Sequence, residues 1–465
     1  MKKAEIVLIT LLLVLAGTVC ASAVELKAGN IRSFDNNILT VTSEEGGILT
    51  IEAISGSIPL ETPVRDLPVE AGTAEIPWEG LTYGGEPLQP GRITLRATLV
   101  CADRTIEQAE IRTEIYSPVP AVLCCLPESQ TFYSAGKSIL RIECAVSNGG
   151  TFELSIAPKD HPEQEVWHCR TKSDGKAPFV IRWDGKGKNH QYCPSGEYVI
   201  TARGVFRPQY EQSAEITILP EPLPEPELAV TGSLIPEDLS DDAAVWEALT
   251  APVTIGDGPE GKGLIIMEDK IPRSGRAGSV SCRTVGIAIL EICDDGWIRV
   301  GAWRQPDGAY TEGWVKADKL RTVRPNSRYG AVVDKKAQTM TVYENGKRIG
   351  TVPVSTGYTT PESRNADTHS GVYLLGTRME SFRQNGHTYN YPIRIDGHNL
   401  IHSAGYVMNN GERNFEEELA ALGTRASHGC IRVDPRTTEE NGGINAWWVW
   451  THLGHDTKII ITPEE

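Results

Sequence analysis

Residues 427–432, which read Ser-His-Gly-Cys-Ile-Arg, are the most informative stretch of this 465-residue sequence. A cysteine becomes a nucleophile when a nearby imidazole takes its proton, and Cys430 has two candidate partners. His428 precedes it by two residues, and His402 ends a separate apolar stretch upstream. Gly429 lets the backbone approach a substrate, so that the amides of Gly429 and Cys430 can face a developing oxyanion. The pattern indicates acyl transfer.

The residues around this stretch predict a β-rich domain. Residues 331–334 and 339–343 alternate apolar and polar side chains, and residues 344–347 read Glu-Asn-Gly-Lys, a turn typical of a β-hairpin. Further short apolar strands are expected at 371–375 and 399–403. Composition and spacing alone leave open a cysteine hydrolase, a structural cluster and a metal site. A zinc site would use His398, His402, His428 and Cys430, which are ligand types but lack a known ligand spacing.

A family resemblance narrows this choice. The segment Ile401-His402-Ser403, followed by the hexapeptide at 427–432, resembles the signature of the L,D-transpeptidase catalytic domain (YkuD-type), over about residues 327–463. Residues 354–357, which read Val-Ser-Thr-Gly, and the pair Thr360-Pro361 also resemble the opening strand and turn of that family.

The resemblance implies a role for each residue of the signature. Cys430 is expected to be the nucleophile and His402 its acid and base. Ser403 is expected to orient His402 through its backbone carbonyl, and Gly429 belongs to the catalytic loop. The substrate side of the site is expected to involve three residues: Ser427 and His428 shape the loop, and Arg432 either holds the loop or binds a substrate carboxylate.

The resemblance also implies the reaction. A cysteine acyltransferase of this family would form an acyl-enzyme on the third residue of a peptidoglycan stem tetrapeptide, release D-alanine and make a 3→3 cross-link. Its partners would be stem peptides, the cell wall and carbapenem-type β-lactams as covalent inhibitors, and no metal or other cofactor is expected. With water or a protein amine as acceptor, the same cysteine would give an L,D-carboxypeptidase or a wall-anchoring transferase. A non-catalytic wall-binding protein is the remaining alternative.

Two segments depart from the usual family spacing. Twenty-four residues separate His402 from Ser427, and within them residues 414–422 place apolar side chains with the spacing of a helix face. A second insertion is expected at residues 362–370. Both would lie near the cleft, where they could act as lids that alter the choice of acceptor.

The rest of the chain predicts a mainly β, multidomain protein. Trp183-Asp184-Gly185 and the strand from Gly196 resemble immunoglobulin-like domains of secreted bacterial proteins, and residues 76–97 form a degenerate copy 105 residues earlier. Residues 312–320 resemble the end of bacterial SH3-like barrels. The expected units are a signal peptide (1–23), two immunoglobulin-like β-sandwiches (24–116 and 117–218), a proline-rich acidic linker (219–243), an SH3-like barrel (244–325) and the catalytic domain (326–465).

Charge and targeting signals define the expected compartment. With 45 Lys and Arg against 61 Asp and Glu, the net charge is −16, which argues against nucleic acid as a partner. Residues 1–23 have a basic start, an apolar run and an Ala-Ser-Ala end, as in a secretory signal peptide, although a retained anchor stays an alternative. The mature protein is therefore expected to be secreted or wall-associated, without stable membrane insertion.

Nine cysteines remain after the predicted signal peptide is removed, so one is expected to stay unpaired, and Cys430 stands apart from the others in the sequence.

Overall fold

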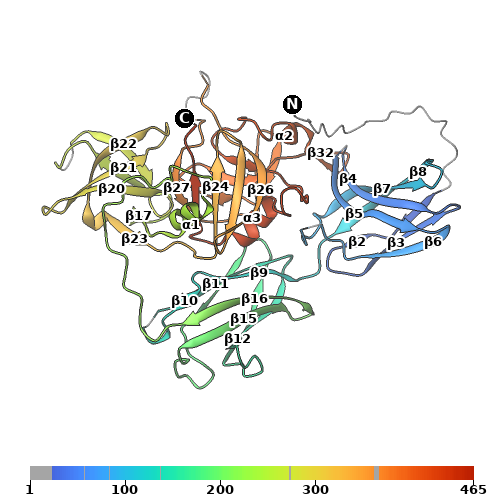
Figure 1. The fold of residues 1–465 in the computed structure, drawn as a ribbon, viewed down its shortest axis with the longest axis horizontal. Helices are drawn as coiled ribbons and strands as arrows, with labels where there is room; N and C mark the ends of the chain where they lie inside the picture. Colours follow the sequence, from blue (N-terminus) through green and yellow to red (C-terminus); the bar gives the residue numbers. More distant parts are fainter. Residues whose placement is uncertain are drawn as a thin grey trace, which may run out of the picture.

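The computed structural model describes residues 24–464 except 57, 83, 137, 272–273 and 361–365, so the predicted signal peptide and Pro361 lie outside the described residues. The chain is mainly β and divided into several units, as predicted. The C-terminal domain, orange to red in Figure 1, lies at the centre, and three smaller β units surround it. No helix in the described part of the chain combines the length and apolar character needed to cross a membrane.

The first two units share one topology. Each has a five-stranded and a three-stranded sheet, and the strand orders β2-β8-β7-β4-β5 and β10-β16-β15-β12-β13 correspond strand by strand. The first unit contains β1 (Glu25–Ala28), β2 (Ile31–Arg32), β3 (Asn37–Ser43), β4 (Gly47–Ser55), β5 (Ile58–Val69), β6 (Gly72–Trp78), β7 (Gly91–Cys101) and β8 (Ile106–Tyr116). The second contains β9 (Val122–Pro127), β10 (Thr131–Phe132), the 3₁₀ turn η1 (Ser134–Gly136), β11 (Leu140–Val146), β12 (Gly150–Pro158), β13 (Trp167–Ser173), β14 (Phe179–Trp183), β15 (Gly196–Gly204) and β16 (Arg207–Ile218).

The tryptophan turn recognised in the sequence repeat has the same geometry in both units. The indole N–H of Trp78 donates to the carbonyl of Leu81, and that of Trp183 donates to the carbonyl of Lys186, each at 2.9 Å. Each tryptophan ends a strand and is buried in the core of its own unit. The repeat is thus structural, since the same indole bond closes the same turn twice.

An extended segment connects these units to the third. Residues 219–241 contain no helix or strand. Helix α1 (Asp242–Thr250) then begins at the Asp241 side chain, which accepts the backbone N–H groups of Ala243 and Ala244. The third unit is a seven-stranded sheet of β17 (Val253–Gly256), β18 (Gly263–Met267), β19 (Arg276–Ser281), β20 (Gly286–Ile292), β21 (Trp297–Trp303), β22 (Tyr310–Lys316) and β23 (Leu320–Val323), with the 3₁₀ turn η2 (Ala317–Lys319).

The C-terminal domain is built on an eight-stranded sheet with the order β27-β35-β24-β25-β26-β34-β31-β30. The predicted hairpin turn is present, with Asn345 and Gly346 at φ of 48° and 81°. Its strands are β24 (Tyr329–Asp334), β25 (Thr339–Glu344), β26 (Lys347–Ser355), β27 (Gly371–Leu374), β30 (Ile393–Arg394), β31 (Leu400–Ser403), β34 (Ile431–Val433) and β35 (Lys458–Ile461). Two small hairpins, β28 (Ser381–Gln384) with β29 (His387–Asn390) and β32 (Val407–Asn409) with β33 (Glu412–Asn414), and helices α2 (Glu416–Ala420) and α3 (Ala446–His452) complete it.

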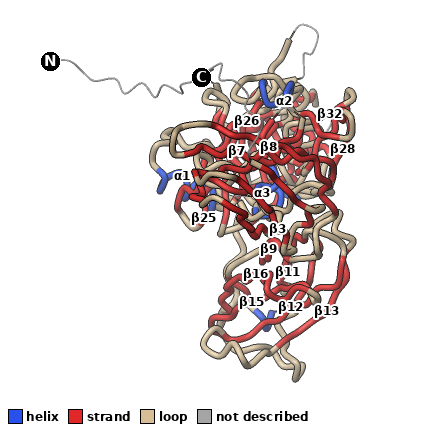
Figure 2. The backbone as a smooth tube through the Cα atoms, turned by 90° about the vertical axis from the view of Figure 1, so that its right-hand side faces the viewer, coloured by secondary structure: helices blue, strands red, loops and turns tan. Residues whose placement is uncertain are grey.

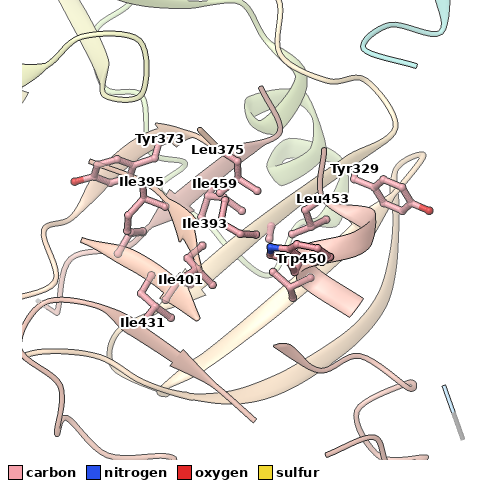
Figure 3. Close-up of a cluster of buried hydrophobic side chains, with 14 of the residues drawn as sticks. Tyr329, Tyr373, Leu375, Ile393, Ile395, Ile401, Ile431, Trp450, Leu453 and Ile459 are labelled. Carbon is pink, nitrogen blue, oxygen red and sulfur yellow. The ribbon is translucent and has the colours of Figure 1, made fainter. Parts of the chain in front are cut away.

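The core of this domain lies between the sheet and helix α3. Figure 3 shows Ile401, Ile431 and Ile459 from three strands of the sheet, with Trp450 of helix α3 in the same cluster. Helix α1 packs on β24 and β35, and the buried ammonium of Lys458 donates to the carbonyl of Ala248 at 2.7 Å. The segment that follows the linker therefore belongs to the hydrophobic packing of the C-terminal domain.

Each surrounding unit contacts the C-terminal domain through polar groups. The hydroxyl of Ser55 in the first unit donates to the carbonyl of Arg413 at 2.9 Å, and Glu143 in the second unit pairs with Arg378. In the third unit, the carboxylate of Glu260 accepts the N–H of Thr377 at 3.0 Å. Figure 2, turned from the first view, shows the second unit extending away from the rest, with β9 and β11 nearest the centre.

All nine cysteines of the described residues are free thiols. Cys125 and Cys144 face one another across the antiparallel pair of β9 and β11. Six cysteines are buried, whereas Cys169, Cys293 and Cys430 are half-buried. Cys430 belongs to none of the cross-strand cysteine pairs that the described residues form.

We predict that Ile459→Ala destabilises the C-terminal domain by about 2–5 kcal/mol, because this fully buried side chain would leave a cavity between the sheet and its helices. Hydrogen exchange of β24, β25 and β35 peptides in increasing urea measures this domain separately from the other units. The control is Met408→Ala, an exposed position in the same domain, which is expected to change stability by less than about 0.5 kcal/mol. Equal losses in the two variants would contradict the placement of the core.

Candidate active site

The parallel pairing of β31 and β34 places the two predicted catalytic residues side by side. In register, Ile401 lies opposite Ile431 and His402 opposite Arg432. Both isoleucines point into the core in Figure 3, so the alternate positions, His402 and Cys430, are directed to the other face of the sheet. Cys430 comes two residues before Arg432, which is the register partner of His402 on the neighbouring strand. The α-carbons of His402 and Cys430 are therefore roughly 8 Å apart. Both side chains line the same cavity, whose volume is about 750 Å³.

His402 is held in one orientation and one tautomer. Its Nδ1–H donates to the carbonyl oxygen of Ser403 at 2.7 Å, which leaves Nε2 as the nitrogen that can accept a proton. The ring is buried against Tyr389 and Phe382, at centroid distances of 4.8 and 5.2 Å. Burial lowers the pKa of His402 to about 4 despite the bond to Ser403, and the charge of Arg432 acts in the same direction as burial. The imidazole is therefore neutral near pH 7.

The hairpin of β28 and β29 forms the wall that buries His402. Phe382 lies on β28 and Tyr389 on β29, and their rings stack with centroids 5.0 Å apart. The hydroxyl of Ser403 accepts the backbone N–H of Asn390 at 3.0 Å. Ser403 therefore contacts two parts of the site: its carbonyl accepts the Nδ1–H of His402, and its hydroxyl accepts a backbone N–H of the β28–β29 hairpin.

The loop before Cys430 is fixed by its own hydrogen bonds. The hydroxyl of Ser427 donates to the carbonyl of Cys430 and accepts the N–H of Gly429 at 3.3 Å, while Thr368 donates to the Gly429 carbonyl at 2.9 Å. Gly429 has φ of 110°, and a Cβ there would lie 2.4 Å from Oδ1 of Asn399, so this position requires glycine. In this structure the Gly429 amide is engaged by Ser427 rather than directed at the cavity.

The thiol of Cys430 is protonated in this environment. Burial raises the pKa of Cys430 to about 11, and the carboxylate of Asp396 adds to the increase. The backbone N–H of Leu400 and the charge of Arg432 oppose that increase without reversing it. With a thiol pKa of about 11 and an imidazole pKa of about 4, the resting pair is neutral rather than a thiolate and an imidazolium.

A series of polar contacts connects the third unit to the nucleophile loop. His369 donates from Nε2 to the carbonyl of Pro306 at 3.1 Å, and its Nδ1 lies 3.5 Å from Asp396. Asp396 accepts both the backbone and the side-chain N–H of Asn399, at 2.7 and 3.0 Å. Oδ1 of Asn399 then faces Gly429. The third unit therefore contributes to the wall of the cavity.

The remaining predicted residues take different places. His428 is exposed at the rim of the cavity, and Ser427 is buried beneath it. Arg432 forms an ion pair with Glu418, with its Nε 3.2 Å from a carboxylate oxygen. Within the described ranges, no group of three or more His, Cys, Asp or Glu side chains is arranged to hold a metal ion.

Sequence reasoning missed several residues that shape the cavity, among them Tyr389, Asp396 and Glu418. The Asp-Gly-His-Asn turn at 396–399, directly before a strand, is the signal that could have identified Asp396, since aspartate commonly accepts backbone N–H groups two and three residues on. Glu418 lies among three consecutive glutamates at 416–418, and nothing in that run distinguishes the buried one.

We predict that alkylation of Cys430 by iodoacetamide rises with pH toward a midpoint near 11, well above the value of about 8.5 for a free cysteine, because burial disfavours the thiolate. Peptide mass spectrometry separates Cys430 from the half-buried Cys169 and Cys293. In urea-unfolded protein the midpoint should return to about 8.5. A folded-state midpoint at or below that of a free cysteine would show instead that a thiolate–imidazolium pair is present at rest.

Comparison with known proteins identifies a family model for the C-terminal domain. The family model of the L,D-transpeptidase catalytic domain (YkuD) matches residues 328–461, whereas no curated protein matches the chain. Similar solved structures include an L,D-transpeptidase from Mycobacterium smegmatis, 16% identical with TM-score 0.24, covering 46% of this chain and 92% of that one. L,D-transpeptidase 3 from Mycobacterium tuberculosis with a faropenem-derived adduct is 16% identical with TM-score 0.24, covering 50% and 89%. A mutant L,D-transpeptidase from Enterococcus faecium is 15% identical with TM-score 0.22, covering 44% and 75%.

The family model, rather than these low-scoring structural matches, carries the assignment. It includes β24 to β35 and therefore His402 on β31 and Cys430 directly before β34. The resemblance inferred from the hexapeptide is confirmed, because the family model places an L,D-transpeptidase catalytic domain (YkuD) at residues 328–461.

Proposed function

We propose that this protein is an exported peptidoglycan L,D-transpeptidase that forms 3→3 cross-links through an acyl-enzyme on Cys430. The observation that carries the proposal is that His402, on β31, and Cys430, directly before the parallel strand β34, line one cavity of about 750 Å³. The family match supplies the general reaction. The signal-peptide pattern at residues 1–23 supports action outside the cytoplasm, where peptidoglycan is found.

The first half-reaction begins from the neutral pair. As the sulfur of Cys430 attacks the carbonyl carbon of the third stem residue, its proton passes to Nε2 of His402. His402 then gives that proton to the amine nitrogen of the terminal D-alanine, the C–N bond breaks and a thioester remains. Because the Ser403 carbonyl accepts Nδ1–H, it also stabilises the imidazolium that forms transiently.

The second half-reaction reverses the proton path. A side-chain amine from the third residue of another stem attacks the thioester carbonyl, and Nε2 of His402 accepts its proton. The C–S bond breaks, the proton returns to Cys430 and the new amide joins the two stems. We assign Ser427 and Gly429 to holding the loop that presents Cys430, and His428 to the rim where substrate enters.

The acceptor decides between this proposal and its alternatives. Water would give an L,D-carboxypeptidase, and a protein amine would give a wall-anchoring transferase. A wall-binding protein without activity would need no base beside a buried thiol. We favour an amine acceptor because the family model that matches residues 328–461 describes transpeptidases, whose acyl acceptor is an amine rather than water. Carbapenem-type β-lactams are proposed covalent inhibitors, in line with the imipenem complex of a related structure.

Product analysis tests the proposed reaction. Incubation of the mature protein with purified disaccharide tetrapeptide is expected to give a cross-linked dimer and one D-alanine per cross-link, measured by mass spectrometry. Cys430→Ala is expected to form no dimer and no carbapenem adduct, because it lacks the acylated atom. Disaccharide tripeptide as the main product would identify the carboxypeptidase, and product formation by Cys430→Ala would refute the assignment of the nucleophile.

The two histidines of the signature should respond differently to mutation. His402→Ala is expected to lower kcat by a factor of about 10²–10⁴, because acid–base transfer is lost in both half-reactions. The exposed His428 is expected to act through loop geometry, so His428→Ala should lower kcat less and lower the thermal stability of the domain as well. Measurement of kcat and Tm for both variants decides the matter, and a larger kcat loss in His428→Ala would reverse the roles.

A further inference from the structure

The insertion between His402 and Ser427 brings one acidic side chain into the active site. Helix α2 begins at Glu416 and carries three consecutive glutamates, of which Glu416 and Glu417 are exposed. Glu418 is directed inward and is only 6% exposed. A carboxyl group with so little access to water needs partners, and the contacts it makes identify its role.

Three segments of the active site meet at the Glu418 carboxylate. Oε2 lies 3.2 Å from Nε of Arg432, on the strand that follows the nucleophile, and accepts the N–H of Gly405 at 3.4 Å. Oε1 accepts the hydroxyl of Tyr389 at 3.2 Å. Tyr389 is the ring that packs edge-on against His402. The insertion is thereby connected to both the nucleophile strand and the wall that buries the base.

Arg432, the basic partner of Glu418 in this ion pair, carries its charge close to His402 and Cys430. Arg432 is opposite His402 in register, and its positive charge lowers the pKa values of both His402 and Cys430. Its side chain is only 12% exposed, so solvent screens this charge weakly. The negative charge of Asp396 has the opposite effect to Arg432 and raises the pKa of Cys430. The other titratable side chains around the cavity are His369, His387, His398, Glu417 and His428.

We propose that Glu418 is a positioning residue of the transpeptidase reaction, which neutralises Arg432 beside the catalytic pair and holds Tyr389 against His402. The insertion is therefore part of the active site rather than a lid that only covers it. Arg432, occupied by Glu418, serves the protein and not a substrate carboxylate. This inference rests on the proposed function only for the turnover measurements, because the electrostatic effect is measurable without substrate.

Glu418→Gln tests the proposal because glutamine keeps the size and the acceptor for Tyr389 while it removes the charge. With Arg432 unopposed, the thiolate of Cys430 is stabilised, so the pH midpoint of alkylation should fall by about one unit. We expect kcat to fall about tenfold with KM changed less than twofold, since a more cationic site disfavours the imidazolium that His402 must form. Glu416→Gln, on the same helix and exposed, is expected to leave the midpoint unchanged.

A double variant separates the electrostatic role from simple loosening of the helix. Loosening of helix α2 would admit water and would also lower the alkylation midpoint of Cys430. That low midpoint would persist in Glu418→Gln/Arg432→Gln, because the double variant has lost every charged contact of the pair. Cancellation of the two charges should instead return the midpoint to within about half a unit of wild type. The double variant leaves no buried unpaired charge, so it also serves if Glu418→Gln folds poorly.

A midpoint unchanged in Glu418→Gln, or one that stays low in the double variant, overturns the proposal. If the wild-type protein shows no turnover of stem peptides while the alkylation midpoints move as described, the proposed function is wrong and the role of Glu418 stands.

Discussion

The parallel pairing of β31 with β34 is the constraint on which the rest of the site depends. Parallel neighbours keep the side-chain alternation of both strands in phase, so His402 and Cys430 are directed to one face while Ile401 and Ile431 fill the core on the other. The same register sets Arg432 opposite His402. Residues 404–426 connect the two strands. They form the β32–β33 hairpin, which contacts the first unit, and helix α2, which carries Glu418.

Burial then decides the chemistry of the pair. The hairpin rings and the surrounding sheet reduce the hydration of both groups, which lowers the pKa of His402 and raises that of Cys430. A neutral thiol is a poor nucleophile and also a poor target for oxidation, so the site is expected to become reactive only when a substrate carbonyl is in place. The aromatic wall, Glu418 and the contact through His369 each come from a different segment, which explains why a small catalytic motif requires such a large enclosure.

The sequence was sufficient to predict the parts of this structure that depend on local patterns. The mainly β character followed from alternation and turns, and the Asn345-Gly346 turn and the repeated Trp78 and Trp183 turns followed from residue types that favour those conformations. The hexapeptide identified the family. Glu418 and Asp396 could not be predicted in the same way, because their partners are brought to them by strand pairing and by packing of distant segments.

Two residues of the signature have protein contacts that the sequence did not indicate. Arg432 had two possible roles in the sequence, and only the three-dimensional position of helix α2 supplies the carboxylate that occupies it. The amide of Gly429 was expected to face an oxyanion, but the Ser427 hydroxyl two residues away accepts it in this structure. The partner is distant in the sequence for Arg432 and close by for Gly429, and neither contact is marked by a residue pattern.

The chemistry of this site depends on His402 resting as a neutral imidazole with its proton on Nδ1, beside a protonated thiol. Nitrogen NMR of protein labelled with ¹⁵N in the histidine rings tests it most directly, with His402→Gln used to assign the signal. Between pH 6 and 8 the account predicts one protonated and one unprotonated ring nitrogen for His402, unchanged across the range, because its pKa is about 4. Two protonated nitrogens at pH 7 would show an imidazolium and contradict the account.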